Sequence, residues 1–194
     1  MSLGMAVLCF LLLGLAVMDA ETMRLPDAFT LPGIALGIAY SEVAAHFRFV
    51  PGAFTLPWRH FEIWDTGKEL QFPFLEHGIP GFVMSTFWAA LAALFLLAIR
   101  WLYSLIRHQE GLGMGDVKLL GMIAAWLGPE LTILTIFLGT LAAAIYGVVM
   151  VMFSRGRYRF RSARLPFGSF LCAAALYAIF AGSPIITWYL KFFQ

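Results

Sequence analysis

Charged side chains are scarce in this chain, and their scarcity excludes most soluble folds. Asp, Glu, Lys and Arg together make up 12% of the 194 residues, whereas hydrophobic residues make up 61% and the mean hydropathy is +0.85. A soluble domain of this length needs more charge to cover its surface. The composition therefore predicts a protein that several helices embed in a lipid bilayer.

Cysteine is nearly absent as well. Cys9 and Cys172 both lie inside apolar runs, where free cysteine usually behaves as a small buried hydrophobe. Two isolated cysteines provide neither a disulfide framework nor a zinc site. His60 and His77 have no cluster of other metal ligands near them. We expect no metal, no cofactor and no nucleic-acid partner.

Six apolar segments reach or approach the length that a helix needs to cross a bilayer, which is about 20 residues. They are 3–18, 29–47, 79–106, 117–127, 131–153 and 166–190. The fourth segment is short, and Gly128 and Pro129 separate it from the fifth, so we expect it to begin at or below the lipid interface. The first segment lacks the basic start and the cleavage site of a secretory signal and is expected to be retained. The sequence predicts an all-α, polytopic membrane protein with six transmembrane helices in a single domain, residues 1–194.

Positive charge is distributed unevenly between the loops. Nine of the 13 Lys and Arg residues fall on the side that holds the loop after the first segment, and five of these nine lie in "RGRYRFRSAR" at 155–164. Because basic loops stay in the cytoplasm, we expect this side to be cytoplasmic and both chain ends to face away from it. The loop at 48–78 is then periplasmic or extracellular, and its many aromatic residues predict that it lies along the membrane interface.

Two aspartates lie at helix ends on the predicted cytoplasmic side. Asp19 ends the first segment and Asp116 opens the fourth. Ionisable residues at membrane depth are costly and are therefore functional candidates. Two carboxyl groups in hydrogen-bonding range share one proton, so that one can activate water while the other protonates a peptide carbonyl. The residues alone leave a second interpretation of Asp116 open, a helix N-terminal cap.

Three stretches, in this order along the chain, resemble the motifs of the type IV prepilin peptidase family. "DAETMRLPDAFTLPGIALG" at 19–37 is similar to its Leu-Pro-Asp and Thr-Leu-Pro signature, and "EGLGMGDVKLLGMIAAWLG" at 110–128 to its Gly-x-Gly-Asp motif. "LPFGSFL" at 165–171 is similar to the Pro-Phe-Gly that opens the last helix of the family. A single Gly-x-Gly-Asp is a weak signal, whereas three ordered motifs on matching helix ends are a strong one.

The resemblance implies an aspartic endopeptidase of the bacterial inner membrane whose catalytic residues are Asp19 and Asp116. Its substrates would be the prepilins or pseudopilins of type IV pilus and type II secretion systems, from which it removes a short basic leader at the cytoplasmic face of the lipid bilayer. Many family members begin with a domain that carries two Cys-x-x-Cys pairs and is associated with N-methylation. Such pairs are missing here, so the resemblance implies a peptidase without this domain, unless the sequence is truncated.

The charged residues near the two aspartates are expected to support the site. Asp27 follows Pro26 and precedes the second segment, where we expect it to be the helix N-cap, with direct support of the catalytic pair as the alternative. Pro26 and Pro32 are expected to flank the start of this helix. Lys118 is expected to extend towards the lipid headgroups rather than towards Asp116.

Glycines surround the predicted site. We expect Gly113 and Gly115, together with Gly111, to adopt backbone conformations that other residues avoid and to leave room for an extended substrate strand. An extended strand is needed because a helical peptide hides its scissile bond. Gly168 is expected to allow close approach between helices near the aspartates.

Two other classes of protein would use the same aspartates. A presenilin-like protease shares the Gly-x-Gly-Asp motif, but the Leu-Pro-Asp signature argues against that family, and its Pro-Ala-Leu segment is missing. A carrier or scaffold would bind protons or cations through the carboxylates, and it is expected to place them near the middle of the membrane. The position of both aspartates at helix ends favours the peptidase.

Overall fold

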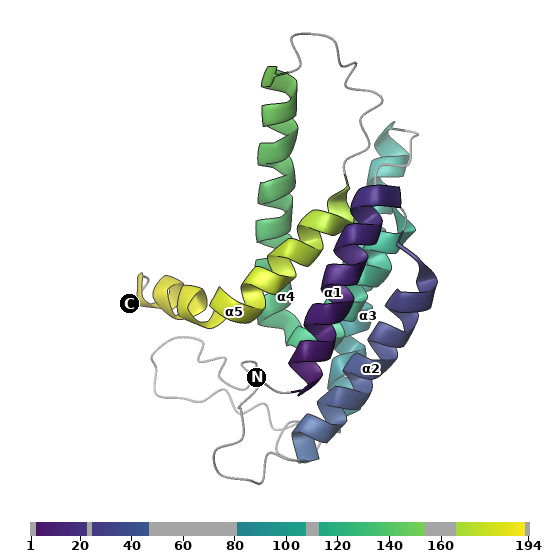
Figure 1. The fold of residues 1–194 in the computed structure, drawn as a ribbon, viewed down its shortest axis with the longest axis vertical. Helices are drawn as coiled ribbons and strands as arrows, with labels where there is room; N and C mark the ends of the chain where they lie inside the picture. Colours follow the sequence, from purple (N-terminus) through teal and green to yellow (C-terminus); the bar gives the residue numbers. More distant parts are fainter. Residues whose placement is uncertain (1–2, 23–24, 47–80, 108–112, 154–165, 193–194) are drawn as a thin grey trace.

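The computed structural model describes residues 3–22, 25–46, 81–107, 113–153 and 166–192. These ranges contain five helices: α1 (Leu3–Thr22), α2 (Asp27–His46), α3 (Gly81–Arg107), α4 (Met114–Phe153) and α5 (Phe167–Phe192). Every element in the described ranges is a helix (Figure 1), which confirms the all-α prediction. The loop at 48–78 lies outside the described residues, and the division into a single domain stays a prediction.

The six predicted spans are not confirmed as six separate helices. By length and composition, three helical stretches of the described residues are able to cross a membrane: Leu3–Thr22, Gly81–Ile106 and Met114–Met150. Phe167–Gly182 in α5 is a shorter apolar helix, and α2 does not meet the same criteria. The fourth and fifth predicted segments are the two halves of one element, α4.

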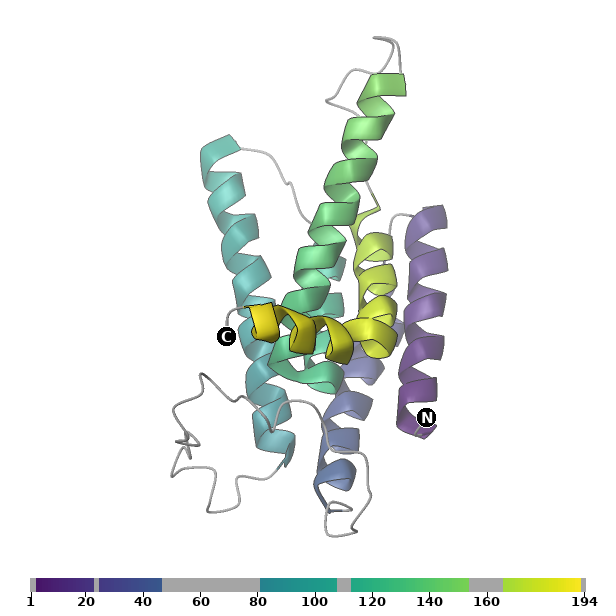
Figure 2. The same ribbon diagram turned by 90° about the vertical axis from the view of Figure 1, so that its left-hand side faces the viewer.

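α4 reverses its direction at the boundary between these two segments. Asp116, near the start of α4, lies beside Gly168 at the start of α5, whereas Leu131 lies against Gly182 further along α5. From there the second half of α4 runs back towards the start of α5, as Figures 1 and 2 show. The two halves are therefore antiparallel, and the first half lies in the middle of the bundle.

The reversal has a local cause in the sequence. Gly128 has φ 75° and ψ −176°, a left-handed conformation that favours glycine. Pro129 has no N–H, so the carbonyl of Ala125 loses its helical partner four residues later. The hydroxyl of Ser85 on α3 donates to this carbonyl at 2.8 Å. α3 thus satisfies the backbone group that the proline leaves free.

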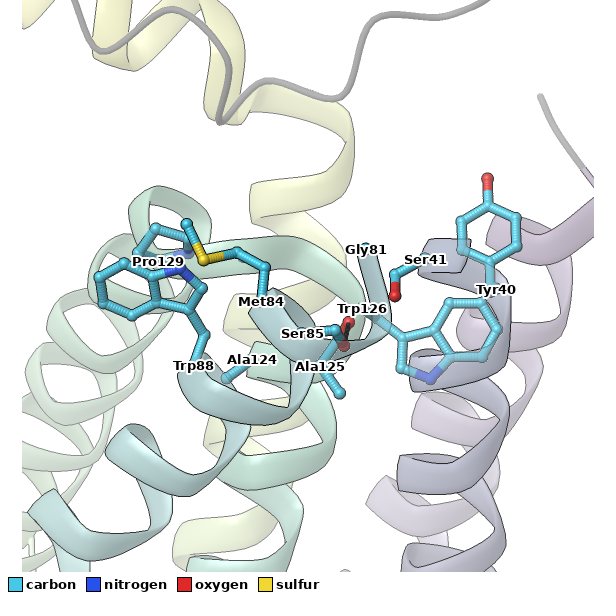
Figure 3. Close-up of a pocket in the computed structure, with 11 residues that line it drawn as sticks. Tyr40, Ser41, Gly81, Met84, Ser85, Trp88, Ala124, Ala125, Trp126 and Pro129 are labelled. Carbon is cyan, nitrogen blue, oxygen red and sulfur yellow. Dashed lines mark hydrogen bonds between the residues drawn. The ribbon is translucent and has the colours of Figure 1, made fainter. Parts of the chain in front are cut away.

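A pocket opens at this kink, at the opposite end of the first half of α4 from its start (Figure 3). Trp88, Met84 and Pro129 line one part of it, and Tyr40 and Trp126 line another. The rings of Tyr40 and Trp126 are stacked with their centroids 5.1 Å apart. The pocket is therefore separate from the aspartates and is lined mainly by apolar side chains.

The first half of α4 is buried on all its faces. Residues 119–128 are all buried, as expected for a helix that is apolar all round. Glycines on α2 allow its close approach: a Cβ at Gly33 would collide with Met122, and one at Gly37 would lie 2.6 Å from the ring of Trp126. The indole N–H of Trp126 donates to the carbonyl of Gly33 at 2.8 Å. This central helix carries Asp116 in its first turn.

The N-cap of α2 lies one residue before the predicted N-cap. The carbonyl of Pro26 accepts hydrogen bonds from the N–H groups of Phe29 (3.1 Å) and Thr30 (3.4 Å), so Pro26 occupies the cap position. Asp27 is the first residue of the helix and not its N-cap. Pro32 lies inside α2 rather than at its edge, so the expectation that two prolines flank the start was wrong for the second of them.

Candidate active site

The structure brings Asp19 and Asp116 together from helices that are far apart in the sequence. Asp19 lies in the last turn of α1 and is 5% exposed, and Asp116 lies in the first turn of α4 and is 8% exposed. A Cβ added to Gly168 would lie 2.9 Å from Oδ2 of Asp19 and 3.0 Å from Oδ1 of Asp116. Oδ2 of Asp19 and Oδ1 of Asp116 therefore lie close together, because both are within 3.0 Å of the same point.

Asp19 caps a helix other than its own. The backbone N–H of Ser169, in the first turn of α5, donates to Oδ2 of Asp19 at 2.6 Å. The hydroxyl of Ser169 lies 3.0 Å from the same oxygen. First-turn N–H groups have no partner within their helix, and the helix dipole favours a negative charge there.

Asp116 lies in the first turn of its own helix. It is the third residue of α4, and a Cβ on Gly113, the residue before the helix, would lie 3.3 Å from Oδ2 of Asp116. The structure places Asp116 near Asp19, whereas its roles as a helix cap and as a catalytic residue stay predictions. Two helix N-termini converge on the pair, one from α4 and one from α5.

Gly113 and Gly115 are needed for space rather than for unusual backbone angles. Among the described residues Gly128 is the glycine with a positive φ, so the conformational argument for Gly113 and Gly115 was wrong. A Cβ on Gly113 would lie 3.3 Å from Oδ2 of Asp116, and one on Gly115 would lie 2.8 Å from Cβ of Leu25. Gly115 thus lets the segment before α2 pack against α4. Gly111 lies outside the described residues.

Lys118 and Asp27 form an ion pair at the edge of the site. Their Nζ and Oδ1 atoms are 2.6 Å apart, and the side chains are 32% and 59% exposed, respectively. The expectation that Lys118 extends to the lipid headgroups was therefore wrong, because its partner is Asp27. The pair links the first residue of α2 to the fifth residue of α4. The hydrogen bonds of the described residues do not join it to Asp19 or Asp116.

We expect Asp27→Asn to lower the free energy of unfolding by no more than about 1 kcal/mol, because an exposed ion pair contributes roughly 0–1 kcal/mol. Asparagine keeps an oxygen that Lys118 can approach. Thermal unfolding of the purified variant checks this, with Lys118→Ala as the matched change on the other partner. A clearly larger loss of stability in either variant would show that the pair contributes more than an exposed ion pair does.

Ser169 is the residue of the site that the sequence analysis missed. It lies within the "LPFGSFL" motif, directly after Gly168. Its position in the sequence could have indicated this role. Ser169 lies in the first turn of a helix that follows a proline, where backbone N–H groups need an acceptor outside the helix. Cys172 lies one helical turn after Gly168 and is completely buried. The described residues contain no group of three His, Cys, Asp or Glu side chains that could hold a metal ion.

The fold and the site define a class of protein: an integral membrane protein with a pair of buried carboxyl groups at converging helix ends. A sequence model described as "Type IV leader peptidase family" matches residues 69–148, which contain Asp116. The chain is similar to this family over these residues, and the resemblance seen in its motifs is confirmed.

Relatives from several bacteria, each named prepilin leader peptidase/N-methyltransferase, match almost the whole chain. The protein of Burkholderia pseudomallei is 33% identical over 177 residues, which cover 91% of this chain and 46% of the relative. That of Pseudomonas aeruginosa is 32% identical over 189 residues, with 97% and 53% covered. That of Aeromonas hydrophila is 27% identical over 192 residues, with 99% and 54% covered. The chain thus spans about half the length of these relatives, and no solved structure matches it.

Proposed function

We propose that this chain is a membrane aspartic endopeptidase that removes the leader from type IV prepilins or pseudopilins. The observation that carries the proposal is the placement of two buried carboxyl groups, Asp19 and Asp116, within 3.0 Å of the point where a Cβ of Gly168 would lie. The similarity to the leader peptidase family and the names of the relatives suggest the substrate class.

The chemistry follows from the proximity of the two carboxyl groups. Two buried carboxylates this close cannot both ionise without strong repulsion, so the pair holds one proton. The ionised member takes a proton from a water molecule as this water attacks the scissile carbonyl carbon. The protonated member donates its proton to the carbonyl oxygen. The pair therefore supplies both the base and the acid that hydrolysis of a peptide bond requires.

The proposed arrangement in the membrane follows the alternating course of the helical segments. α1, α2, α3, the two antiparallel halves of α4, and α5 provide six segments, each of which we propose to cross the bilayer of the bacterial inner membrane. Asp19 and Asp116 then lie at the same membrane face. The excess of Lys and Arg in the loops on that side supports a cytoplasmic active site.

Incubation of the purified chain with a prepilin that carries its basic leader tests the proposal. The expected products are the free leader and a shortened pilin, resolved by electrophoresis and identified by mass spectrometry. The double variant Asp19→Asn/Asp116→Asn is the negative control. Intact substrate after prolonged incubation with correctly folded protein, combined with proton or cation flux in proteoliposomes, would favour a carrier instead.

We expect EDTA and thiol reagents to leave leader cleavage unchanged, because the proposed chemistry uses only carboxyl groups. Cys172 is completely buried, and Cys9 lies ten residues before Asp19 on α1, about 15 Å away along the helix. The cleavage rate is measured before and after each treatment. A loss of activity in EDTA that added zinc reverses would reveal a metal requirement.

A further inference from the structure

The two carboxyl groups of the site have unequal hydrogen-bond partners. Ser169 donates its backbone N–H to Oδ2 of Asp19, and its Oγ lies 3.0 Å from the same oxygen. The hydrogen bonds of the described residues give Asp116 no such pair of partners. Ser169 therefore distinguishes the two aspartates.

The single hydrogen of this hydroxyl has two possible acceptors. Oγ of Ser169 lies 3.0 Å from Oδ2 of Asp19 and 3.0 Å from the backbone carbonyl oxygen of Ala16, and that carbonyl can only accept. When Asp19 is ionised, the hydroxyl can donate to it. When Asp19 is protonated, the hydroxyl can turn to Ala16 and accept the carboxyl hydrogen. Ser169 therefore has a favourable arrangement for each protonation state of Asp19.

The strengths of the two arrangements are different. A hydrogen bond to an ionised group contributes about 1.5–3 kcal/mol, whereas one between neutral groups contributes about 0.5–1.5 kcal/mol. The arrangement with protonated Asp19 also contains the bond from the hydroxyl to Ala16, but the Ala16 carbonyl already accepts the N–H four residues later in α1, so this second bond adds little. The arrangement with ionised Asp19 is consequently the stronger. The Ser169 N–H at 2.6 Å adds to this preference, because it belongs to the first turn of α5 and always points to the same oxygen.

The other charged and titratable groups on the packed helices do not reverse this preference. Asp116 on α4 lies near Asp19 beside Gly168, and one shared proton removes the repulsion between the two groups equally whichever of them holds it. Lys118 on α4 is paired with Asp27 on α2. Glu21 on α1 is exposed, and Cys172 on α5 is buried behind Gly168 and contributes no charge as a thiol.

We infer that Ser169 is a positioning residue that holds Asp19 as the ionised, water-activating member of the pair and leaves the shared proton on Asp116. The inference rests on the proposed function. The water oxygen bonds to the scissile carbon as one of its protons passes to Asp19, and the proton of Asp116 passes to the carbonyl oxygen. When the C–N bond breaks, the leaving nitrogen takes the proton from Asp19, and the diol hydroxyl returns a proton to Asp116 as the new carboxyl group forms.

Removal of the hydroxyl alone provides the test. Ser169→Ala keeps the backbone N–H and loses the O–H donor, and Ser169→Thr keeps both. In leader cleavage we expect the acidic limb of the kcat/KM profile of Ser169→Ala to move to higher pH by about 0.5–1 unit, the difference of roughly 1 kcal/mol between the two kinds of hydrogen bond. Ser169→Thr should restore the wild-type position. Ser41→Ala is the matched control, since its hydroxyl bonds to Ile38 within α2.

An infrared titration of the protonated carboxyl band gives a readout that does not depend on cleavage. Its midpoint should move in Ser169→Ala in the same direction and by a similar amount, and it should stay in place in Ser169→Thr and Ser41→Ala. Superimposable profiles and midpoints for wild type and Ser169→Ala would overturn the inference, as would equal shifts in the Ala and Thr variants. A wild-type protein that does not cleave, but whose carboxyl band shifts in Ser169→Ala, would overturn the proposed function while supporting the role of Ser169.

Discussion

Asp19→Asn and Asp116→Asn should each abolish leader cleavage while the protein remains folded in the membrane. An amide has almost the same shape as a carboxyl group, and at position 19 it still offers an oxygen to the N–H of Ser169. It cannot take or give the catalytic proton, however, and loss of general acid–base catalysis costs about 10²- to 10⁴-fold in rate. The expected result is a rate that falls below detection in a standard cleavage assay.

Stability measurements separate a chemical defect from misfolding in these variants. The pair carries one negative charge, and neither substitution adds a second, so the unfolding temperature should stay near the wild-type value or rise. Glu21→Gln is the matched control, because Glu21 lies two residues after Asp19 on the same helix and is exposed. It should cleave at the wild-type rate. Near-normal turnover by either Asn variant would disprove the assignment of the catalytic pair.

Gly168→Ala should reduce cleavage by about 100-fold, although it adds only one methyl group. The new Cβ would lie 2.9 Å from Oδ2 and 3.0 Å from Cγ of Asp19, and 3.0 Å from Oδ1 of Asp116. Oδ2 of Asp19 cannot move away freely, because the N–H of Ser169 holds it at 2.6 Å. The methyl group must therefore separate the carboxyl groups or displace α5, and an error of about 1 Å in catalytic geometry costs roughly 10²-fold.

The matched control for Gly168→Ala is Gly14→Ala on α1. A Cβ at Gly14 meets nothing within 4 Å, and alanine is the better helix former by up to about 1 kcal/mol. This variant should cleave normally and unfold at the same or a slightly higher temperature. Cleavage rates and unfolding curves of the two variants are compared under identical conditions. Equal rates for both would show that the space between the carboxyl groups is not limiting.

The sequence predicted the all-helical fold and marked the two aspartates as candidates, because both depend on local patterns. Apolar length marks a helix in a membrane protein, and a carboxylate at the end of such a helix stands out. The Gly128-Pro129 pair also marked the break in α4 correctly. The sequence could not show that α4 turns back at this break, because the turn depends on how both halves pack against α5.

The side-chain partners were harder to predict, since they depend on contacts between distant helices. Lys118 and Asp27 are 91 positions apart, and Ser169 and Asp19 are 150 positions apart. A basic residue near a membrane surface usually extends to lipid, and the sequence contains nothing that favours Asp27 instead. Gly168 was expected to allow close approach between helices. The atoms nearest to its added Cβ belong instead to the carboxyl groups of Asp19 and Asp116.

The start of α5 also determines when during synthesis the site can form. Asp19 and Asp116 belong to α1 and α4, which enter the membrane before α5, and both carboxyl groups lie against Gly168 at its first turn. Until α5 is inserted, Gly168 is not beside the two aspartates, and Asp19 lacks its hydrogen-bond partner Ser169. A nascent chain that has completed only α1 to α4 therefore carries both aspartates without a finished active site. Under the proposed function, peptide cleavage thus requires the completed bundle and not the two aspartates alone.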